Sequence, residues 1–236
     1  MPTKTNSSAG AATARRSPRE RLLAAADELF YAEGVHSVGI DRVIERAGVA
    51  KASLYTTFGS KEELVHAYLD GRRERLLKRL RAAVDAAGDD PVQRILAVFD
   101  GQAQMYREPT FHGCAFARAA AEAPPGGGIE LATDAYRAAI KRLFVELSVD
   151  AGVSDPERLA TQLQLLYDGG SLSVKEDRDP AISAPQRAAA AALIAVALDA
   201  GQHADVAAPT AGRRSEAWTS RPAPRPSVQT SPTPGR

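Results

Sequence analysis

Apolar residues recur every three or four positions along most of this chain, the spacing at which side chains share one face of an α-helix. Runs with the strict alternation of a half-buried strand are missing from the sequence. The first amphipathic segment carries its apolar residues at Leu22, Ala26, Leu29 and Phe30 and ends at Gly34. The pattern predicts an all-α protein with about nine helices.

Capping motifs and Gly or Pro breaks set the limits of these helices. Residues 17–20 (SPRE) and 60–63 (SKEE) each place a hydroxyl three residues before a carboxylate, which is a capping box. Residues 154–157 (SDPE) and 183–186 (SAPQ) have the same form. Longer helices are predicted at 60–87, 92–106, 114–123, 129–151, 157–175 and 186–200.

Two short segments lie between the first helix and the long one. Residues 40–47 and 51–58 are each followed by a glycine and joined by about three residues, which is the spacing of a helix-turn-helix. Their apolar positions can form a small core made of Ile40, Val43, Ala47, Val49, Leu54 and Phe58. The polar residues of 51–57 then form an outer face that fits the major groove of DNA.

Charge is unevenly distributed, although the net charge is only +1. Residues 1–82 carry 15 Lys and Arg against 10 Asp and Glu, whereas residues 83–200 carry 10 against 17. A basic head on an acidic body is typical of a polyanion-binding module joined to a domain with another role. The basic stretch at 72–81 is predicted to be a solvated helix face, with added phosphate contacts as the alternative.

Composition excludes several classes of protein. No run approaches ~18 apolar residues and no secretory signal precedes the first helix, so we expect a cytoplasmic protein without a membrane span. Cys114 is the only cysteine, and the four histidines lack the spacing of metal ligands on a helix, so we expect no metal and no cofactor. No nucleotide-binding or nucleophile motif is complete, so we expect no enzyme.

The segment AGVAKASLYTTFGSKEEL at 47–64 resembles the recognition-helix signature of the TetR/AcrR family of bacterial regulators. The resemblance extends over residues 19–70, and more weakly over 113–198, where GCAFARAAAE and LATQLQLLYDGG are similar to the regulatory domain of one branch of the family. It implies a helix-turn-helix domain at 17–65 and an effector-binding and dimerisation domain at 66–200. The small polar residues of 1–16 and the prolines of 201–236 predict a disordered arm and a disordered tail.

The resemblance also implies which residues face double-stranded DNA. These are Gly39, Lys51, Ala52, Ser53, Tyr55, Thr56 and Lys61. We assign Tyr55 and Lys61 to the phosphate backbone, because a phenol and a point charge position the protein without reading sequence. Ser53 and Thr56 are the better candidates for base edges, and Lys51 suits either role.

Three positions depart from the family pattern. Gly39 and Ala50 stand where a hydroxyl residue commonly caps a helix, so each cap is weaker or missing. Ile44 stands where a small residue is usual, which alters how closely the two short helices pack. These departures leave open an alternative, a helical interaction or ligand-binding protein with a weakened DNA-binding head.

The family's C-terminal domain implies a small-molecule effector and a homodimer. A pocket is expected around 109–114, with His112, Cys114, Phe116, Tyr136, Phe144 and Tyr167 as candidate contacts. Cys114 is either an inert small residue or a redox sensor. Candidate dimer residues on the last two helices are Leu163, Leu166, Gly170, Leu193 and Val196, with packing inside the chain as the alternative. The resemblance predicts a repressor that a small molecule releases from a partly palindromic operator.

Overall fold

The computed structural model describes residues 16–123 and 127–204, and within them it contains nine α-helices, one short 3-10 helix and no strand. This confirms the predicted all-α class. The elements are α2 (Pro18–Glu33), α3 (Ile40–Ala47), α4 (Lys51–Phe58), α5 (Lys61–Ala86), α6 (Pro91–Tyr106), α7 (Ala115–Glu122), α8 (Gly128–Asp150), α9 (Pro156–Asp177), η1 (Pro180–Ile182) and α10 (Ser183–Ala204). The expected arm at 1–16 and tail at 201–236 lie almost wholly outside the described residues, and α10 continues four residues past the predicted helix end at residue 200.

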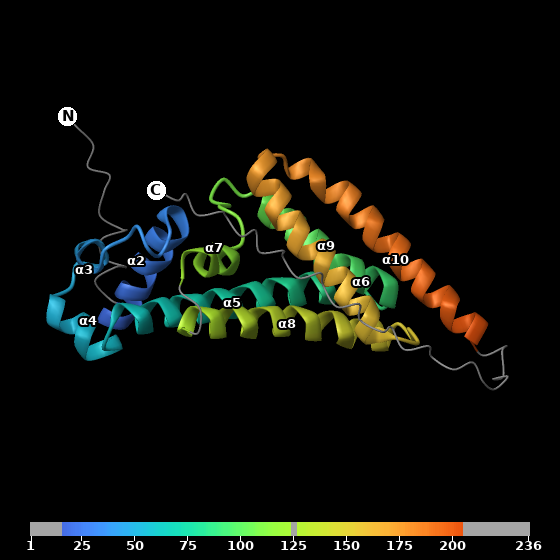
Figure 1. The fold of residues 1–236 in the computed structure, drawn as a ribbon, viewed down its shortest axis with the longest axis horizontal. Coiled ribbons are helices and arrows are strands. Elements are labelled where there is room, and N and C mark those ends of the chain that lie inside the picture. The colour runs from blue at the N-terminus through green and yellow to red at the C-terminus, as the bar shows by residue number, and fades with distance from the viewer. Residues whose placement is uncertain (1–15, 124–126, 205–236) are drawn as a thin grey trace, which may run out of the picture.

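The helices divide into a small head and a longer body (Figure 1). Helices α2, α3 and α4 form the head, and α5 runs from it deep into the body beside α8. Helices α6, α9 and α10 complete the far part of the body, with α10 along its outer edge. Buried apolar residues from Leu22 in α2 to Ile194 in α10 form one continuous core. Head and body are therefore packed together, with α5 shared between them.

Of the four predicted capping boxes, one forms completely, one forms only its serine hydrogen bond, and two do not form. The Ser17 hydroxyl accepts from the Glu20 N–H (3.2 Å) while the Glu20 carboxylate accepts from the Ser17 N–H (2.8 Å), and the Ser60 hydroxyl caps α5. At α9 the cap is Asp155 instead of the serine before it, because Pro156 occupies the first helical position.

At α10 the predicted capping box does not form, because its glutamine is used in the core. Ser183 already belongs to the helix. The buried Gln186 amide donates to the Gln102 side chain (2.8 Å) and to the Leu166 carbonyl (3.0 Å). Buried polar groups of this kind need partners, and here the partners lie on α6 and α9.

The turn of the helix-turn-helix is fixed by Gly48. Its backbone is left-handed (φ 61°), a conformation that glycine adopts without steric cost, and its N–H donates to the Glu45 carbonyl (3.1 Å). The Arg21 guanidinium of α2 donates to the Gly48 carbonyl (3.0 Å). The turn that aims α4 is thereby tied to the first helix of the head.

One segment of the described chain, Pro180–Ala200 in η1 and α10, is long and apolar enough to cross a membrane by length and composition alone. Its mean hydropathy is 1.5, and only 22% of the segment is buried within the chain. An exposed apolar surface of this size is typical of a site where another protein binds.

Candidate nucleic-acid interface and ligand cavity

Helix α4 presents its polar face to solvent and is anchored through one side chain. Leu54 is fully buried (0% exposed), and it is the one buried residue of this helix. On the outer face Tyr55 is 48% exposed, and Lys51, Ala52 and Thr56 are exposed as well. Four of the predicted DNA-facing residues are thus exposed on α4, while Ser53 of α4 and Lys61 of α5 are half-buried and Gly39 is exposed at the N-terminus of α3.

Lys51 does not stand free on this surface. Its ammonium group forms an ion pair with the Asp41 carboxylate on α3 (2.9 Å), and this hydrogen bond and charge raise the pKa of Lys51. Both side chains are well exposed, so the pair is weak in water. A phosphate that binds Lys51 must nevertheless compete with Asp41 and approach its negative charge.

Replacing Asp41 by asparagine is therefore expected to strengthen DNA binding. The change frees Lys51 and removes a repulsive charge, so affinity for unrelated DNA should rise about three- to tenfold at low salt and less at high salt. Fluorescence anisotropy with a random-sequence duplex at two salt concentrations measures this. Glu33→Gln, which breaks the Arg42–Glu33 pair elsewhere in the head, is the matched control.

Neither short helix has a side-chain cap. Gly39 and Ala50 occupy the two N-cap positions and make no side-chain hydrogen bond. Both have the extended backbone that a capping serine adopts, with ψ of 153° and 148°. A side chain added at Gly39 would meet no atom within 4 Å. Geometry thus permits a hydroxyl at both positions.

Ala50→Ser is expected to stabilise the head. A serine hydroxyl at this position can accept from the first-turn N–H groups of α4, which adds about 1 kcal/mol to the free energy of unfolding. Thermal denaturation followed by circular dichroism tests this, with Ala50→Val as a variant that adds bulk but no acceptor. Equal stability of the serine and valine variants would contradict it.

A cavity of about 510 Å³ lies between the head and the body. Five of the six residues predicted for the effector site line it, and they are His112, Cys114, Phe116, Tyr136 and Tyr167. Phe144 does not line it, and its buried ring packs against Phe99 in the body. The volume is that of a small-molecule site.

Aromatic groups form much of the cavity wall. The Phe116 and Tyr136 rings stack with centroids 4.1 Å apart, and the Tyr31 ring meets the His112 ring edge-on at 5.3 Å. The Tyr31 hydroxyl donates to the Gly113 carbonyl (3.0 Å) and accepts from the His112 N–H (3.1 Å). Tyr31 thereby joins α2 of the head to the loop that forms one side of the cavity.

Burial keeps the cavity's acidic hydroxyl and thiol groups neutral. It raises the pKa of Tyr136 well above the usual phenol value, and it also raises the pKa of the Cys114 thiol. Oxidation and alkylation proceed through the thiolate, so a raised pKa lowers the reactivity of Cys114. The pKa shift favours the inert interpretation of this cysteine over the redox sensor.

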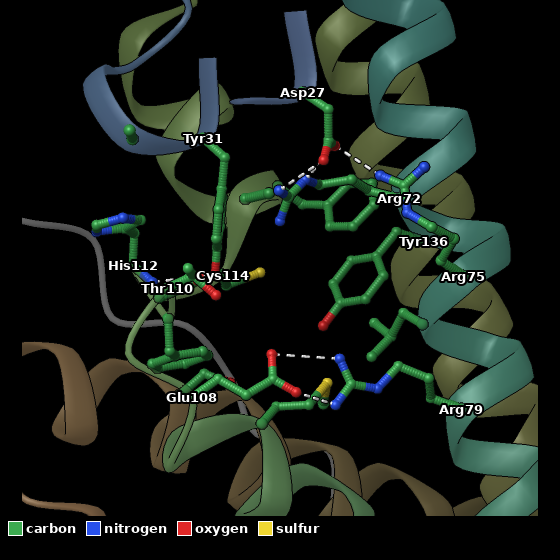
Figure 2. A pocket seen from close by; sticks show the side chains of 18 of the residues that line it. Asp27, Tyr31, Arg72, Arg75, Arg79, Glu108, Thr110, His112, Cys114 and Tyr136 are labelled. Atoms are coloured by element: carbon green, nitrogen blue, oxygen red, sulfur yellow. Dashed lines mark hydrogen bonds and ion pairs between the residues drawn. The ribbon is translucent and has the colours of Figure 1, made fainter. Parts of the chain in front are cut away.

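Three arginines of α5 form the opposite wall (Figure 2). Arg72 and Arg75 both bind the Asp27 carboxylate of α2, and Arg79 binds Glu108. Arg75 and Arg79 are exposed, as the prediction of a solvated face expects, and Arg72 is half-buried, but all three side chains also line the cavity. Their spacing of three and four residues on one helix face was the signal that could have identified them.

The predicted dimer residues fall into two groups. Leu163 is fully buried in the core of its own chain, and a side chain at Gly170 would lie 2.2 Å from the Gln186 amide. Both pack inside the chain, so neither can contact a partner. Leu166 and Leu193 are half-buried, and Val196 is 68% exposed.

Comparison with known proteins agrees with this arrangement. The family described as "Bacterial regulatory proteins, tetR family" matches residues 22–68. The transcriptional activator FasR of Mycolicibacterium smegmatis is 39% identical over 82 residues, which cover 35% of this chain and 37% of FasR. The transcriptional repressor KstR2 of Mycobacterium tuberculosis is 34% identical over 83 residues, covering 35% and 41%. The chain thus spans less than half the length of these two relatives.

A solved structure extends the similarity to the body. SCO4454 of Streptomyces coelicolor, a TetR-family transcriptional regulator, is 32% identical, with a TM-score of 0.71 over 76% of this chain and 95% of that protein. A putative TetR-type regulator of Streptomyces avermitilis is 31% identical, with a TM-score of 0.63 over 79% and 99%. These matches do not favour the alternative of a helical interaction protein. The chain belongs to the TetR family of transcriptional regulators.

Proposed function

We propose that this chain is a homodimeric DNA-binding regulator of the cytoplasm whose affinity for its operator is controlled by a small molecule in the cavity between head and body. The observation that carries the proposal is the exposed polar face of α4, which Leu54 and the Gly48 turn hold in place. The cavity is lined in part by residues of α2 in the same head. The residues assigned to DNA are Gly39, Lys51, Ala52, Ser53, Tyr55, Thr56 and Lys61.

The exposed apolar face of α9 and α10 supports the homodimer. Leu165 and Leu172 are 65% and 55% exposed and lie seven residues apart, on one face of α9 with Gly169 between them. Val196 is 68% exposed on α10, the helix that packs against α9. A second copy placed here forms a symmetric four-helix contact and covers the apolar helix that would otherwise face water. The proposed interface therefore contains Leu165 and Leu172, and it no longer includes the predicted residues Leu163 and Gly170.

The shared helix α5 supports control by the cavity. It begins at Lys61 in the head domain, proposed at 17–65, and continues without a break into the body domain, proposed at 66–200. There its arginines line the cavity. A ligand that shifts α5 therefore changes the position of the head. In the dimer such a shift changes the distance between two heads, which must lie about 34–36 Å apart to read a palindromic operator.

A reporter gene driven by the protein's own promoter tests the function. Tyr55→Ala with Lys61→Ala is expected to abolish regulation, because both phosphate contacts that position α4 are lost. Lys141→Ala, a lysine of α8 in the body, is the charge-matched control. We expect the reporter to be derepressed by the double variant. Unchanged expression of the reporter in the double variant would contradict the DNA-binding proposal.

A further inference from the structure

Three arginines and three carboxylates line the cavity, but only two of the carboxylates pair with the arginines. Arg72, Arg75 and Arg79 lie three and four residues apart on one face of α5, and their partners in the cavity wall are Asp27 and Glu108. Glu28 also lines the cavity, but its carboxylate binds Arg46 of α3 outside it. Three guanidinium groups therefore share two carboxylates.

The arginines also keep unused hydrogen-bond donors. Arg72 donates to Asp27 through Nε (2.8 Å) and Nη2 (3.2 Å), and Arg75 donates to the same carboxylate through Nη2 (2.6 Å). Each guanidinium has five N–H groups. Among the described residues, Nη1 of Arg72 and both Nε and Nη1 of Arg75 have no hydrogen-bond partner. An anion can therefore bind here before it displaces Asp27.

The remaining surface of the cavity is apolar and aromatic. Figure 2 shows the Asp27 pairs at one end, the Arg79–Glu108 pair at the other, and the Tyr136 ring between them. Phe111, Phe116 and Met105 also line the space. A ligand that fills it thus needs an apolar part for these side chains and a negative charge for α5.

We propose that the effector is an apolar or aromatic carboxylate whose carboxylate group binds Arg72 and Arg75 in competition with Asp27. The inference rests on the proposed ligand control and names the chemistry of the ligand. A carboxylate matches the planar fork of a guanidinium, and its charge-assisted hydrogen bonds are stronger than those of a neutral group.

Competition at Asp27 provides the link from ligand to DNA. Asp27 belongs to α2 of the head, and its bonds to Arg72 and Arg75 tie the head to α5. The Arg72 guanidinium also lies 3.4 Å from the centre of the Tyr31 ring of α2. A carboxylate that draws these arginines away from Asp27 weakens the contact between α2 and α5, so the head moves relative to the body.

Matched pairs of acids and amides test the charge requirement. Indoleacetate and indoleacetamide, phenylbutyrate and phenylbutyramide, and naphthoate and naphthamide differ in charge but barely in shape. Binding to the full chain is measured by thermal shift and calorimetry at constant ionic strength. We expect at least one acid to bind about tenfold or more tightly than its amide, because charge-assisted hydrogen bonds are lost in the amide. The proposal is overturned if no acid binds or if the amides bind equally well.

Variants identify the site. Arg75→Gln is expected to reduce the preference for the acid at least about fivefold without changing the affinity for the amide. Arg72→Gln should do the same, but this side chain is packed against Tyr31, so the more exposed Arg75 is the safer test of the two. Arg81→Gln is the control, because Arg81 lies on the same helix and binds Glu146 outside the cavity. Asp27→Asn, which removes the competitor, is expected to tighten acid binding. If Arg75→Gln and Arg81→Gln reduce the preference for the acid equally, the proposed site is wrong.

DNA binding measured in the same samples separates this inference from the proposed function. Promoter DNA that is bound without ligand and released by the acid but not by its amide supports both. DNA binding that no acid alters overturns the carboxylate effector and leaves the DNA-binding regulator intact. Acid binding in a protein that shifts no promoter DNA overturns the proposed function alone.

Discussion

Replacing Leu165 and Leu172 by arginine is expected to convert the protein to monomers and to lower its operator affinity about a hundredfold or more. Both side chains are more than half exposed on one face of α9, where the proposed partner subunit covers them. Two arginines there would face the same two in the symmetric partner, so apolar burial is lost and like charges meet. The two heads then bind their half-sites independently.

Light scattering after gel filtration measures the subunit number, and anisotropy with operator DNA measures the affinity. Leu131→Arg is the matched control, because Leu131 is equally exposed (68%) but lies on α8. That variant should stay dimeric and bind DNA normally. A double variant that remains a dimer would show that the proposed interface is wrong.

The second large effect is expected at Leu54. This side chain is the one fully buried contact by which α4 is held in the head, so Leu54→Ala should lower the free energy of opening of this helix by about 2–5 kcal/mol. Hydrogen exchange of the amides at 51–58 measures that opening directly. Specific DNA binding should fall with it, because the recognition helix no longer has a fixed orientation.

Thr56→Ala is the control for this experiment. Thr56 lies on the exposed face of the same helix, so its loss should change the opening free energy by no more than about 0.5 kcal/mol. It should nevertheless weaken discrimination between operator and unrelated DNA, because Thr56 is a candidate base contact. Equal protection of the α4 amides from hydrogen exchange in both variants would contradict the anchoring role of Leu54.

The helix-turn-helix could be predicted because its signals are local. Helices α3 and α4 have the predicted limits, 40–47 and 51–58, since Gly48 and Gly59 follow their last residues and both adopt a positive φ. The missing caps at Gly39 and Ala50 were also readable from residue type alone. In each case the decisive contacts lie within a few residues along the chain.

The cavity and the interface depend on contacts between distant segments, so only part of each could be predicted from local sequence patterns. The aromatic residues of the cavity could be named, and the spacing of the arginines marks one helix face, but their partners could not be found because Asp27 and Glu108 lie 45 and 29 residues from Arg72 and Arg79. For the same reason the sequence leaves open whether Gly170 contacts a partner subunit or packs inside the chain. Its space is filled by Gln186, a residue of the next helix whose sequence context suggested a cap.

Titration of the purified protein onto DNA that spans its own promoter tests the central claim, that α4 reads a specific operator. The titration is made with excess unrelated competitor, at two salt concentrations, for the wild type and for Lys61→Gln. We predict a complex that survives the competitor, and a salt dependence that is weaker by about one released counterion in the variant. Promoter and unrelated DNA competing equally well for the wild type would contradict the claim.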